Sequence, residues 1–444
     1  MRRIAFIGGG SAKFVRGTVL HLLAAEELRD SRVVLMDIDA RRLDRAAQVV
    51  RRMAAEARAP LSVEPTADLG AALDGADYVI VTVMVGGMKH YASDTAIPAG
   101  GGVLPAVGDT GGPGGVMRLL RTAPLLRRMA GLLRERAPRA WVLNFANPMS
   151  MLTQTLIECG HGRTVGLCHS IASGFHPVAD FLGVPRDEVA FVAAGLNHMA
   201  YYLTLTHRGR DLYPDIRSRA EAIAEQAEHW EAETWRRERR GVERVRMELV
   251  RRLGYLTVEP HAQGDFHPWF RKDEASIRHY GPPPGWALDF DRRLGAHAER
   301  EIDEILAGRA PALGAQGGED AVTIIRAIET GRPCTTYANV RNDGGIGNLP
   351  PWAVVDVPCR VDAGGVHPLP VGDLPAQLAA VMAPHVFAYR LAVDGVMGRD
   401  RAKVRQAIQA DPLTGAVLTL PRIAALVDEL LEENRAFMDG WPEA

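Results

Sequence analysis

The amino-acid sequence predicts an α/β fold, in which a Rossmann-like, doubly wound parallel sheet is followed by a mixed α+β domain. Three observations lead to this prediction. Short apolar runs alternate with helical patterns through the first half of the 444-residue chain, the first run passes directly into a glycine turn, and an acidic residue ends the second run. The strict alternation stops near residue 197. We therefore expect one domain over residues 1–195 and a second over residues 196–444.

The first forty residues follow the pattern strand, glycine turn, helix and strand. The apolar run 4–7 leads into the turn 8–11, and a second apolar run, 33–36, ends in Asp37. Glycines at such a turn let the backbone approach a pyrophosphate, and the acid can accept a hydrogen bond from a ribose hydroxyl. A carboxylate would repel a 2′-phosphate, which favours NAD over NADP. Because Lys13 stands where the strict motif has its last glycine, an ordinary glycine turn is the alternative. The predicted cofactor contacts here are Gly8, Gly10, Ser11 and Asp37.

Two further glycine-rich segments follow predicted strands. The apolar strand 77–83 is followed by Gly86, at the carboxyl end of a parallel strand, where open α/β sheets bind ligands. Gly86 is therefore another predicted cofactor contact, with a structural turn as the alternative. Residues 100–115 are so rich in glycine that we expect a loop, followed by a helix from Val116. Asp109 is the only carboxylate in that stretch, and it is either a turn aspartate or a functional group.

Polar side chains end the next predicted strands. Asn147 precedes a proline, which favours extended backbone, so its amide can face a cleft. Cys168 and His169 follow the short strand 164–167, and His198 follows the apolar run that starts near residue 191. A thiolate and an imidazole at neighbouring strand ends could hold a divalent ion. The alternative is a buried cysteine and a hydrogen-bonded core histidine.

The second half of the chain carries fewer signals. Residues 216–252 form a charged pattern that predicts one long helix, acting as a lid, bridge or subunit interface. Residues 254–272 combine two carboxylates, two histidines, aromatics and two cations, which is typical of a carbohydrate or anion site; an exposed loop is the alternative. We expect helices over 286–308 and 319–330, strands over 335–340 and 353–357, and mostly helix from 374 to 437.

The composition is that of an ordinary globular protein. Hydrophobic residues make up 47% and charged residues 24%, and the formal net charge of -2 gives no argument for nucleic acid or a membrane surface. No run of eighteen apolar residues occurs, and the N-terminus reads as a strand rather than a signal peptide. The four cysteines are widely spaced and do not resemble a disulfide framework. We expect a cytoplasmic protein with no nucleic-acid or membrane partner.

Taken together, these stretches resemble glycoside hydrolase family 4, the NAD-dependent glycosidases, and the related NAD-dependent sulfoquinovosidases. The resemblance covers nearly the whole chain. It implies a small-molecule glycoside substrate, NAD+ as a catalytic cofactor, a divalent metal ion, usually Mn2+, and a homodimer or homotetramer. The motifs that carry it are, in order, IAFIGGGS, MDID, VGDTGGPGG, NFANPMS, GLCHS, GLNH, PWF and NVRNDGGIGNLP.

The resemblance implies a redox cycle without net oxidation. Bound NAD+ oxidises the third ring hydroxyl of the sugar, and a base then removes the acidified proton on the neighbouring carbon. The aglycone leaves, water adds and the NADH reduces the ketone, while the metal ion stabilises the enediolate. Carried over to this chain, the resemblance implies metal ligands at Cys168 and His198, sugar contacts at Asn147 and His169, and an acid/base at Asp109.

One departure from the family pattern concerns the base. Many members carry Glu-Tyr before the Pro-Trp-Phe motif, and that tyrosine is a proposed base. Here the corresponding residues are Asp265 and Phe266, and His267 is inserted before Pro268. Phe266 cannot accept a proton. The candidates are therefore Asp265, which the family placement favours, and His267, whose usual pKa lies near neutrality.

The same loop suggests a substrate class. Arg271 and Lys272, with two histidines nearby, cluster where the far end of the sugar could lie, and cations of this kind recognise anions. We predict an anionic α-glycoside, a sulfoquinovoside first and an α-galacturonide second, ahead of neutral α-glucosides or α-galactosides and 6-phospho-glycosides. Rival interpretations are a 2-hydroxy acid dehydrogenase of the lactate or malate type and a non-catalytic NAD-binding protein. Neither explains GLCHS together with GLNH.

Overall fold

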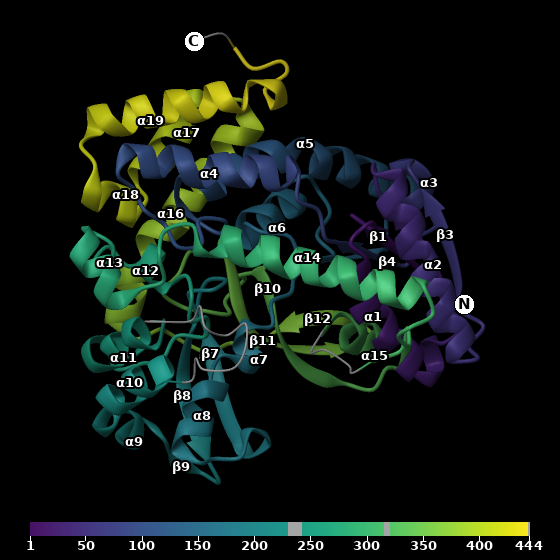
Figure 1. Cartoon of the computed structure of the whole chain (residues 1–444), viewed down its shortest axis with the longest axis horizontal. Coiled ribbons are helices and arrows are strands. Elements are labelled where there is room, and N and C mark those ends of the chain that lie inside the picture. Colours follow the sequence, from purple (N-terminus) through teal and green to yellow (C-terminus); the bar gives the residue numbers. More distant parts are fainter. Residues whose placement is uncertain (230–241, 315–319, 443–444) are drawn as a thin grey trace.

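The computed structural model of the protein describes residues 1–229, 242–314 and 320–442. A nine-stranded sheet forms its centre, with strand order β12-β11-β10-β6-β5-β4-β1-β2-β3 (Figure 1). Strands β1 to β6 pair in parallel, which confirms the predicted Rossmann-like sheet. They are β1 (Arg3–Ile7), β2 (Arg32–Met36), β3 (Ser62–Thr66), β4 (Tyr78–Val81), β5 (Trp141–Asn144) and β6 (Thr164–Gly166).

The parallel strands are wound in two directions from the centre of the sheet. The chain runs outward from β1 to β3, returns to β4 on the other side of β1, and then continues to β6. Because parallel crossovers are right-handed, the two halves place their helices on opposite faces. Accordingly, α1 (Ala12–Ala24) packs against α2 (Ala40–Glu56), while α5 (Gly112–Arg136) packs against α3 (Leu69–Leu73) and α6 (Met149–Glu158). The direction reverses between β1 and β4, which is where such sheets bind ligands.

The chain after residue 188 adds a smaller sheet and then completes the main one. β10 (Cys334–Arg341), β11 (Val354–Asp362) and β12 (Gly365–Pro368) are antiparallel, and β10 joins β6. The main sheet therefore takes strands from both sides of residue 195. The second sheet holds β7 (Val189–Ala194), β8 (Tyr201–His207) and β9 (Arg210–Asp211), all antiparallel, over a separate hydrophobic core.

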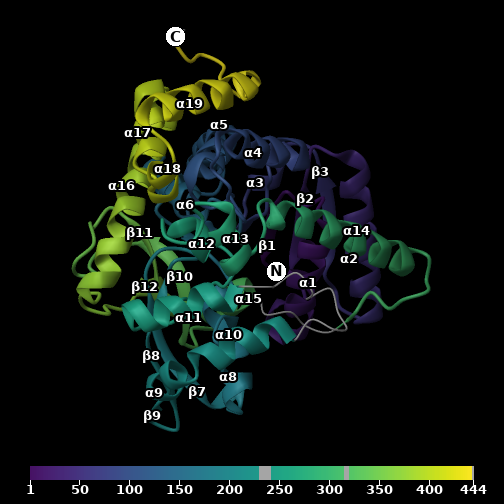
Figure 2. The same ribbon diagram turned by 60° about the vertical axis from the view of Figure 1, so that its left-hand side comes forward.

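Long helices cover the parallel sheet. α14 (Trp286–Leu306) lies along α4 (Gly87–Gly101), α1 and α2, and it crosses the front of the molecule in Figure 2. α16 (Ala376–Gly398) packs on α5 and α6, and α19 (Leu420–Glu433) packs on α4. Within the described residues, α16 alone is long and apolar enough to cross a membrane, judged by length and composition. Of that apolar window, 44% is buried inside the fold, where α16 packs against α5, α6 and the helix that follows it.

The prediction of one long helix over residues 216–252 is wrong. The chain forms α9 (Tyr213–Ser218) and α10 (Ala220–His229), and α11 (Val242–Leu253) packs back against α10; residues 230–241 lie outside the described residues. The chain turns back here because apolar side chains of both helices are buried, which the charge pattern did not reveal. Ile223 on α10 and Val250 on α11 both enter the core of the smaller sheet, so the segment folds over that core.

The glycine-dense stretch 100–115 is only partly a loop, which corrects the prediction. Its first two residues end α4, a helix that the sequence did not suggest, and α5 begins at Gly112 rather than Val116. Pro113 fits the first turn of α5 because its fixed φ is helical and the missing N–H has no helical partner there. The loop itself is therefore short, and it carries Asp109 directly to the start of α5.

Candidate active site

The glycine turn after β1 is held against Asp37. The N–H of Gly10 donates to Asp37 Oδ2 at 2.9 Å, and a Cβ on Gly10 would lie 2.6 Å from that oxygen. Gly8 has a φ of +94°, and a Cβ there would meet the Thr82 carbonyl at 2.9 Å. Ser11 is the residue before α1 and makes no side-chain cap. No hydrogen bond from the Ser11 side chain therefore covers the N-terminus of α1, the end of a helix where phosphate groups bind.

Apolar side chains beside this turn were missed by the sequence analysis. Ile38 follows Asp37 and is 89% exposed, and Phe14 on α1 is 43% exposed. Met84, between β4 and Gly86, is 42% exposed. Exposed apolar side chains around a polar turn form a surface suited to a flat aromatic base. Sequence patterns could not reveal them because an isolated apolar residue after a strand reads as core.

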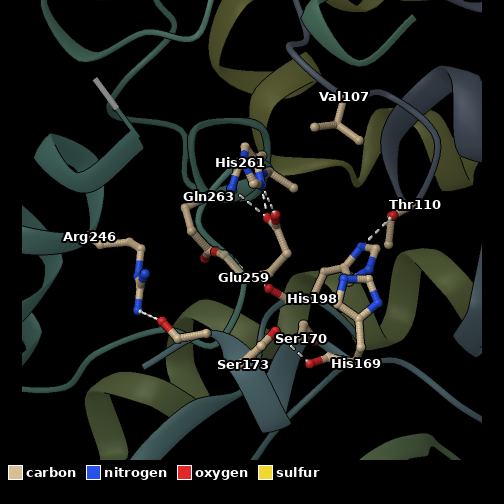
Figure 3. A network of polar contacts seen from close by, with 12 residues as sticks. Val107, Thr110, His169, Ser170, Ser173, His198, Arg246, Glu259, His261 and Gln263 are labelled. Atoms are coloured by element: carbon tan, nitrogen blue, oxygen red, sulfur yellow. Dashed lines mark hydrogen bonds and ion pairs between the residues drawn. The ribbon is translucent and has the colours of Figure 1, made fainter. Parts of the chain in front are cut away.

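Asp109 is the centre of a second polar cluster. Its Oδ2 accepts hydrogen bonds from Asn147 Nδ2 at 3.1 Å and from Arg118 Nη1 at 3.2 Å, and its Oδ1 accepts one from Thr110 Oγ1 at 2.7 Å. The Thr110 hydroxyl also lies 2.9 Å from His198 Nδ1 (Figure 3). Since the hydroxyl proton goes to Asp109, the imidazole Nδ1–H donates to Thr110. His198 Nε2 is thereby left for another partner.

Cys168 is the partner of that imidazole. The sequence placed the two residues at the ends of different strands, and the structure brings them into a direct side-chain interaction. Burial by itself would lower the pKa of His198, but Cys168, Glu259 and Asp109 outweigh it and raise the pKa to about 10. His198 also has a φ of +62°, a left-handed backbone conformation that few residues other than glycine adopt. The thiol additionally lies 3.2 Å from Ser170 Oγ.

These side chains fit a divalent ion with open coordination positions. A thiolate and an imidazole can bind a transition metal, zinc more tightly than manganese. Substrate oxygens can fill further coordination positions. Within residues 1–229, 242–314 and 320–442, no three His, Cys, Asp or Glu side chains gather as a metal group. Asn147 Oδ1 and both polar atoms of the Asn197 side chain are buried with no partner among the described residues. Buried polar atoms of that kind require a ligand or water. His169 follows Cys168 with an exposed side chain.

A hydrogen-bond network in the segment 259–263 holds the backbone of His198 (Figure 3). Gln263 Nε2 donates to the His198 carbonyl at 2.6 Å, and Glu259 accepts from the Ala262 N–H at 2.6 Å and from His261 Nδ1 at 2.5 Å. Burial opposes ionisation of Glu259, yet His261, His198 and the backbone N–H outweigh it and hold its pKa at about 2. His261 is thus paired with a carboxylate rather than turned toward a substrate anion.

In the structure, both candidates for the catalytic base, His267 and Asp265, are engaged in internal hydrogen bonds. His267 is fully buried, its Nδ1 donates to the Gln263 carbonyl at 2.9 Å, and its Nε2 accepts from the Tyr201 hydroxyl at 2.7 Å. Burial lowers its pKa to about 4. Both nitrogens are occupied, so a catalytic role for His267 is incompatible with this arrangement. The Asp265 carboxylate accepts hydrogen bonds from three backbone N–H groups of the loop before Asp109.

The two cations predicted to meet the sugar separate in the structure. The Arg271 side chain is 0% exposed; its Nε donates to the Leu104 carbonyl at 2.6 Å and its Nη1 to the Pro282 carbonyl at 2.9 Å. A direct contact of Arg271 with substrate is incompatible with that burial. Lys272, the next residue, is exposed. Adjacent residues in this segment point to opposite sides, which a sequence cluster cannot show.

Asp291 is a site residue that the sequence analysis missed. Burial, then the charge of Asp109, raises its pKa to about 6, against the opposing effects of Arg118 and Lys13. Its electrostatic neighbours therefore come from both the glycine turn and the Asp109 cluster. The centre of the Tyr91 ring lies 4.1 Å from the guanidinium carbon of Arg118. Asp291 lies on α14 in an ordinary amphipathic pattern, so nothing in the sequence marks it.

Comparison with known proteins identifies the family. The model of the family 4 glycosyl hydrolases matches residues 3–184, and the model of the family 4 glycosyl hydrolase C-terminal domain matches residues 193–414. An α-galactosidase of Bacillus subtilis (strain 168) is 32% identical over 454 residues, covering 100% of both chains. The chain belongs to family 4 of the glycosyl hydrolases. This resemblance, expected from the motifs, is confirmed, and the protein is a glycosidase.

Other family 4 relatives differ in their named substrates. An α-galacturonidase of Bacillus subtilis (strain 168) is 28% identical to this family 4 glycosidase, covering 93% of each chain. A solved 6-phospho-α-glucosidase from gut microorganisms, in complex with NAD and Mn2+, superposes with a TM-score of 0.83 at 21% identity, covering 100% of both chains. At that identity the likeness speaks for the fold alone. Named substrates vary across the family while the fold stays the same.

Proposed function

We propose that this family 4 glycosidase hydrolyses α-glycosides in a redox-neutral cycle that uses NAD+ and a divalent metal ion, with Mn2+ the expected metal. The observation that carries the proposal is the cluster in which Asp109, Thr110, His198 and Cys168 connect through hydrogen bonds beside the glycine turn. When bound, NAD+ would supply a reversible hydride acceptor for a sugar carbon, and the metal ion a Lewis acid for neighbouring sugar oxygens. The membership of the chain in family 4, given by both family models, supports this choice.

Each predicted contact has a place in this scheme. Asp37 would accept a hydrogen bond from a ribose hydroxyl, and the turn with Gly8, Gly10 and Ser11 would approach the pyrophosphate, with Gly86 at the facing strand end. Cys168 and His198 would hold the metal ion. Thr110 would fix the imidazole so that Nε2 faces the ion, as carboxylates and hydroxyls do for metal-bound histidines.

Asp109 and Asn147 would act on the sugar. Asn147 holds Asp109 through its amide N–H groups and keeps its buried Oδ1 for a sugar hydroxyl proton. Asp109, paired with Arg118, would accept the proton of a sugar hydroxyl or return it. His169, exposed next to Cys168, would contact a second hydroxyl. Asp291, with its pKa raised to about 6, is a carboxyl able to exchange protons near neutral pH.

We propose an α-galactoside as the preferred substrate, an α-galacturonide next, and a sulfoquinovoside after these. The sequence favoured an anionic sugar because Arg271, Lys272, His261 and His267 lie close together in the chain. Arg271 and His267 are buried in internal hydrogen bonds and His261 pairs with Glu259, which leaves the anion hypothesis with exposed Lys272 alone. Relatives named α-galactosidase, 32% and 31% identical to this chain, support the uncharged sugar.

The test is release of aglycone from aryl α-galactoside, α-galacturonide, sulfoquinovoside and α-glucoside, with and without NAD+ and Mn2+, while NADH absorbance is followed. We expect cleavage that needs NAD+, does not accumulate NADH, and is lost on chelation and restored by Mn2+. Steady NADH accumulation would instead indicate a dehydrogenase. The order of rates on the four sugars decides the substrate class.

We further propose a cytoplasmic homodimer or homotetramer. The four cysteines are free thiols in the structure, which suits a reducing compartment. Light scattering at several protein concentrations would give the oligomeric state, and a monomeric mass at micromolar concentration would rule this proposal out.

A further inference from the structure

The loop that leads to Asp109 is held by a distant carboxylate. The N–H of Ala106 donates to Asp265 Oδ1 at 2.8 Å, and the N–H groups of Val107 and Gly108 donate to Oδ2 at 2.8 and 3.2 Å. Three successive N–H groups that converge on one point form a nest for an anion. In this protein the anion is a side chain 157 residues further along the chain.

The carbonyl groups of the same loop are held as well. Arg271 Nε donates to the Leu104 carbonyl at 2.6 Å, and it also lies 3.3 Å from Asp265 Oδ1. The segment after it contributes backbone donors, with the Gly285 N–H bound to the Pro105 carbonyl at 2.9 Å and the Ala287 N–H to the Ala106 carbonyl at 3.0 Å. The Tyr91 hydroxyl donates to the Val107 carbonyl at 3.0 Å.

We propose that Asp265 and Arg271 are positioning residues, which clamp residues 104–108 so that Asp109 and Thr110 meet Asn147 and His198. The inference rests on the proposed function and deepens it, because it gives two residues of the expected chemistry a different task. The clamp holds the backbone directly before Asp109, whose position relative to the substrate must be precise. Gly108 and Thr110 are one residue from Asp109, and a misplacement of about 1 Å at a reacting group can cost about a hundredfold in rate.

The geometry also argues against Asp265 as the proton acceptor. Its Oδ1 faces the Ala106 N–H and Arg271, and its Oδ2 faces two further N–H groups. Burial raises the pKa of Asp265, while Arg271 and the three N–H groups oppose that rise. The geometry argues against Asp265 as the base because both of its oxygens already accept hydrogen bonds from the loop. Its oxygens would have to leave the loop before they could reach a substrate.

The decisive variant is Asp265→Asn. It keeps the size of the side chain, but its NH2 group faces N–H donors and cannot accept their hydrogen bonds. We expect kcat to fall about 10- to 100-fold, NAD+ affinity to stay within about twofold, and the amides of residues 106–108 to exchange with deuterium at least about tenfold faster. The acid limb of the pH–rate profile should keep its midpoint, since the base remains.

Asp273→Asn is the matched control, because Asp273 lies on the same segment and its carboxylate accepts the Ser276 N–H at 2.7 Å without touching the loop. It should change neither rate nor exchange at residues 106–108. Tyr91→Phe is the milder second variant, which removes one hydrogen bond from the Val107 carbonyl and serves if Asp265→Asn fails to fold. It should raise exchange at the same amides and lower kcat by less than Asp265→Asn does.

Two results would overturn the clamp. Unchanged amide exchange in Asp265→Asn or Tyr91→Phe would show that these side chains do not hold the loop. Loss of the acid limb of the pH–rate profile, with exchange unchanged, would make Asp265 the base. The exchange measurement needs no substrate, so it tests the clamp even if the aryl glycosides are not cleaved and the proposed function fails.

Discussion

Two glycine-rich segments lie at the carboxyl edge of the parallel sheet, and they are held in different ways. The turn 8–10 is fixed by its own neighbourhood, since its N–H groups bind the carbonyl of Met36, the last residue of the adjacent strand β2, and the side chain of Asp37 directly after it. The loop 104–110 is fixed by residues from α12 (Gln263–Phe266) to α14 and by Tyr91 on α4. The first segment is a local βαβ device, whereas the second exists only after the second half of the chain has folded onto the first.

The difference follows from what each segment must do. A nucleotide turn needs only backbone that approaches a ligand, and glycine with an adjacent helix N-terminus supplies this locally. A loop that presents Asp109 to other side chains must be placed precisely in three dimensions, and glycine-rich backbone has no preference of its own. External hydrogen bonds must offset its conformational entropy.

The largest expected effect is at the loop. Asp109→Asn removes the proton acceptor while keeping the shape, and we expect kcat to fall about 10²- to 10⁴-fold. NAD+ affinity, measured by fluorescence titration, should stay unchanged, because the turn 8–10 is held separately. A comparable loss of NAD+ affinity would show that the two segments act as one unit.

The next effect sharpens the link between the loop and the metal residues. Thr110→Val removes the hydroxyl that lies 2.9 Å from His198 Nδ1. We expect Mn2+ affinity to fall about 10- to 100-fold, since outer partners of metal-bound histidines contribute about that much. Calorimetric titration with Mn2+ measures it. Thr18→Val is the control, because that hydroxyl donates to the Phe14 carbonyl inside α1.

A third prediction tests the local turn. In Gly10→Ala the new Cβ would lie 2.6 Å from Asp37 Oδ2, so either the turn or the carboxylate must move. We expect NAD+ to bind about tenfold more weakly, with an overpacking cost of roughly 1–3 kcal/mol in stability. Gly17→Ala is the matched control. Gly17 lies in α1 with open space around its Cβ position, and alanine there should stabilise the helix by about 0.5–1 kcal/mol.

The smallest expected effect concerns Asp291, whose pKa depends on charges from both segments. Its pKa in the folded protein, raised to about 6, exceeds the usual aspartate value of 3.8, so the folded state favours the neutral acid. The protein therefore loses stability as pH rises from about 4 through about 6. Asp291→Asn should stabilise the protein by about 1–3 kcal/mol at pH 7 and by nothing below about pH 4, as thermal melts at both pH values would show. In an Asp109→Asn background the gain should shrink, because one repelling charge is gone.

The sequence predicted those parts of the site whose interactions join neighbouring strands or short motifs, and it missed those that join distant elements. Gly10 and Asp37 were found because a βαβ unit brings the ends of neighbouring strands together by rule. Cys168 and His198 were found because both end strand-like runs, and their contact is seen in the structure. Arg271 and His267 were misassigned, since charge next to charge in the sequence does not tell which side chain faces inward. Asp291 was missed because its environment comes from other elements.

The sequence by itself determined the parallel sheet, its glycine turn and the family, because hydrophobic periodicity and short motifs are local properties of the chain. Only the tertiary structure decided which polar residues of the segment 259–272 face the site and which hold it together. That decision depends on burial. Placing Arg271 and Asp265 inside the protein obliges them to find internal hydrogen-bond partners, and the loop before Asp109 provides those partners.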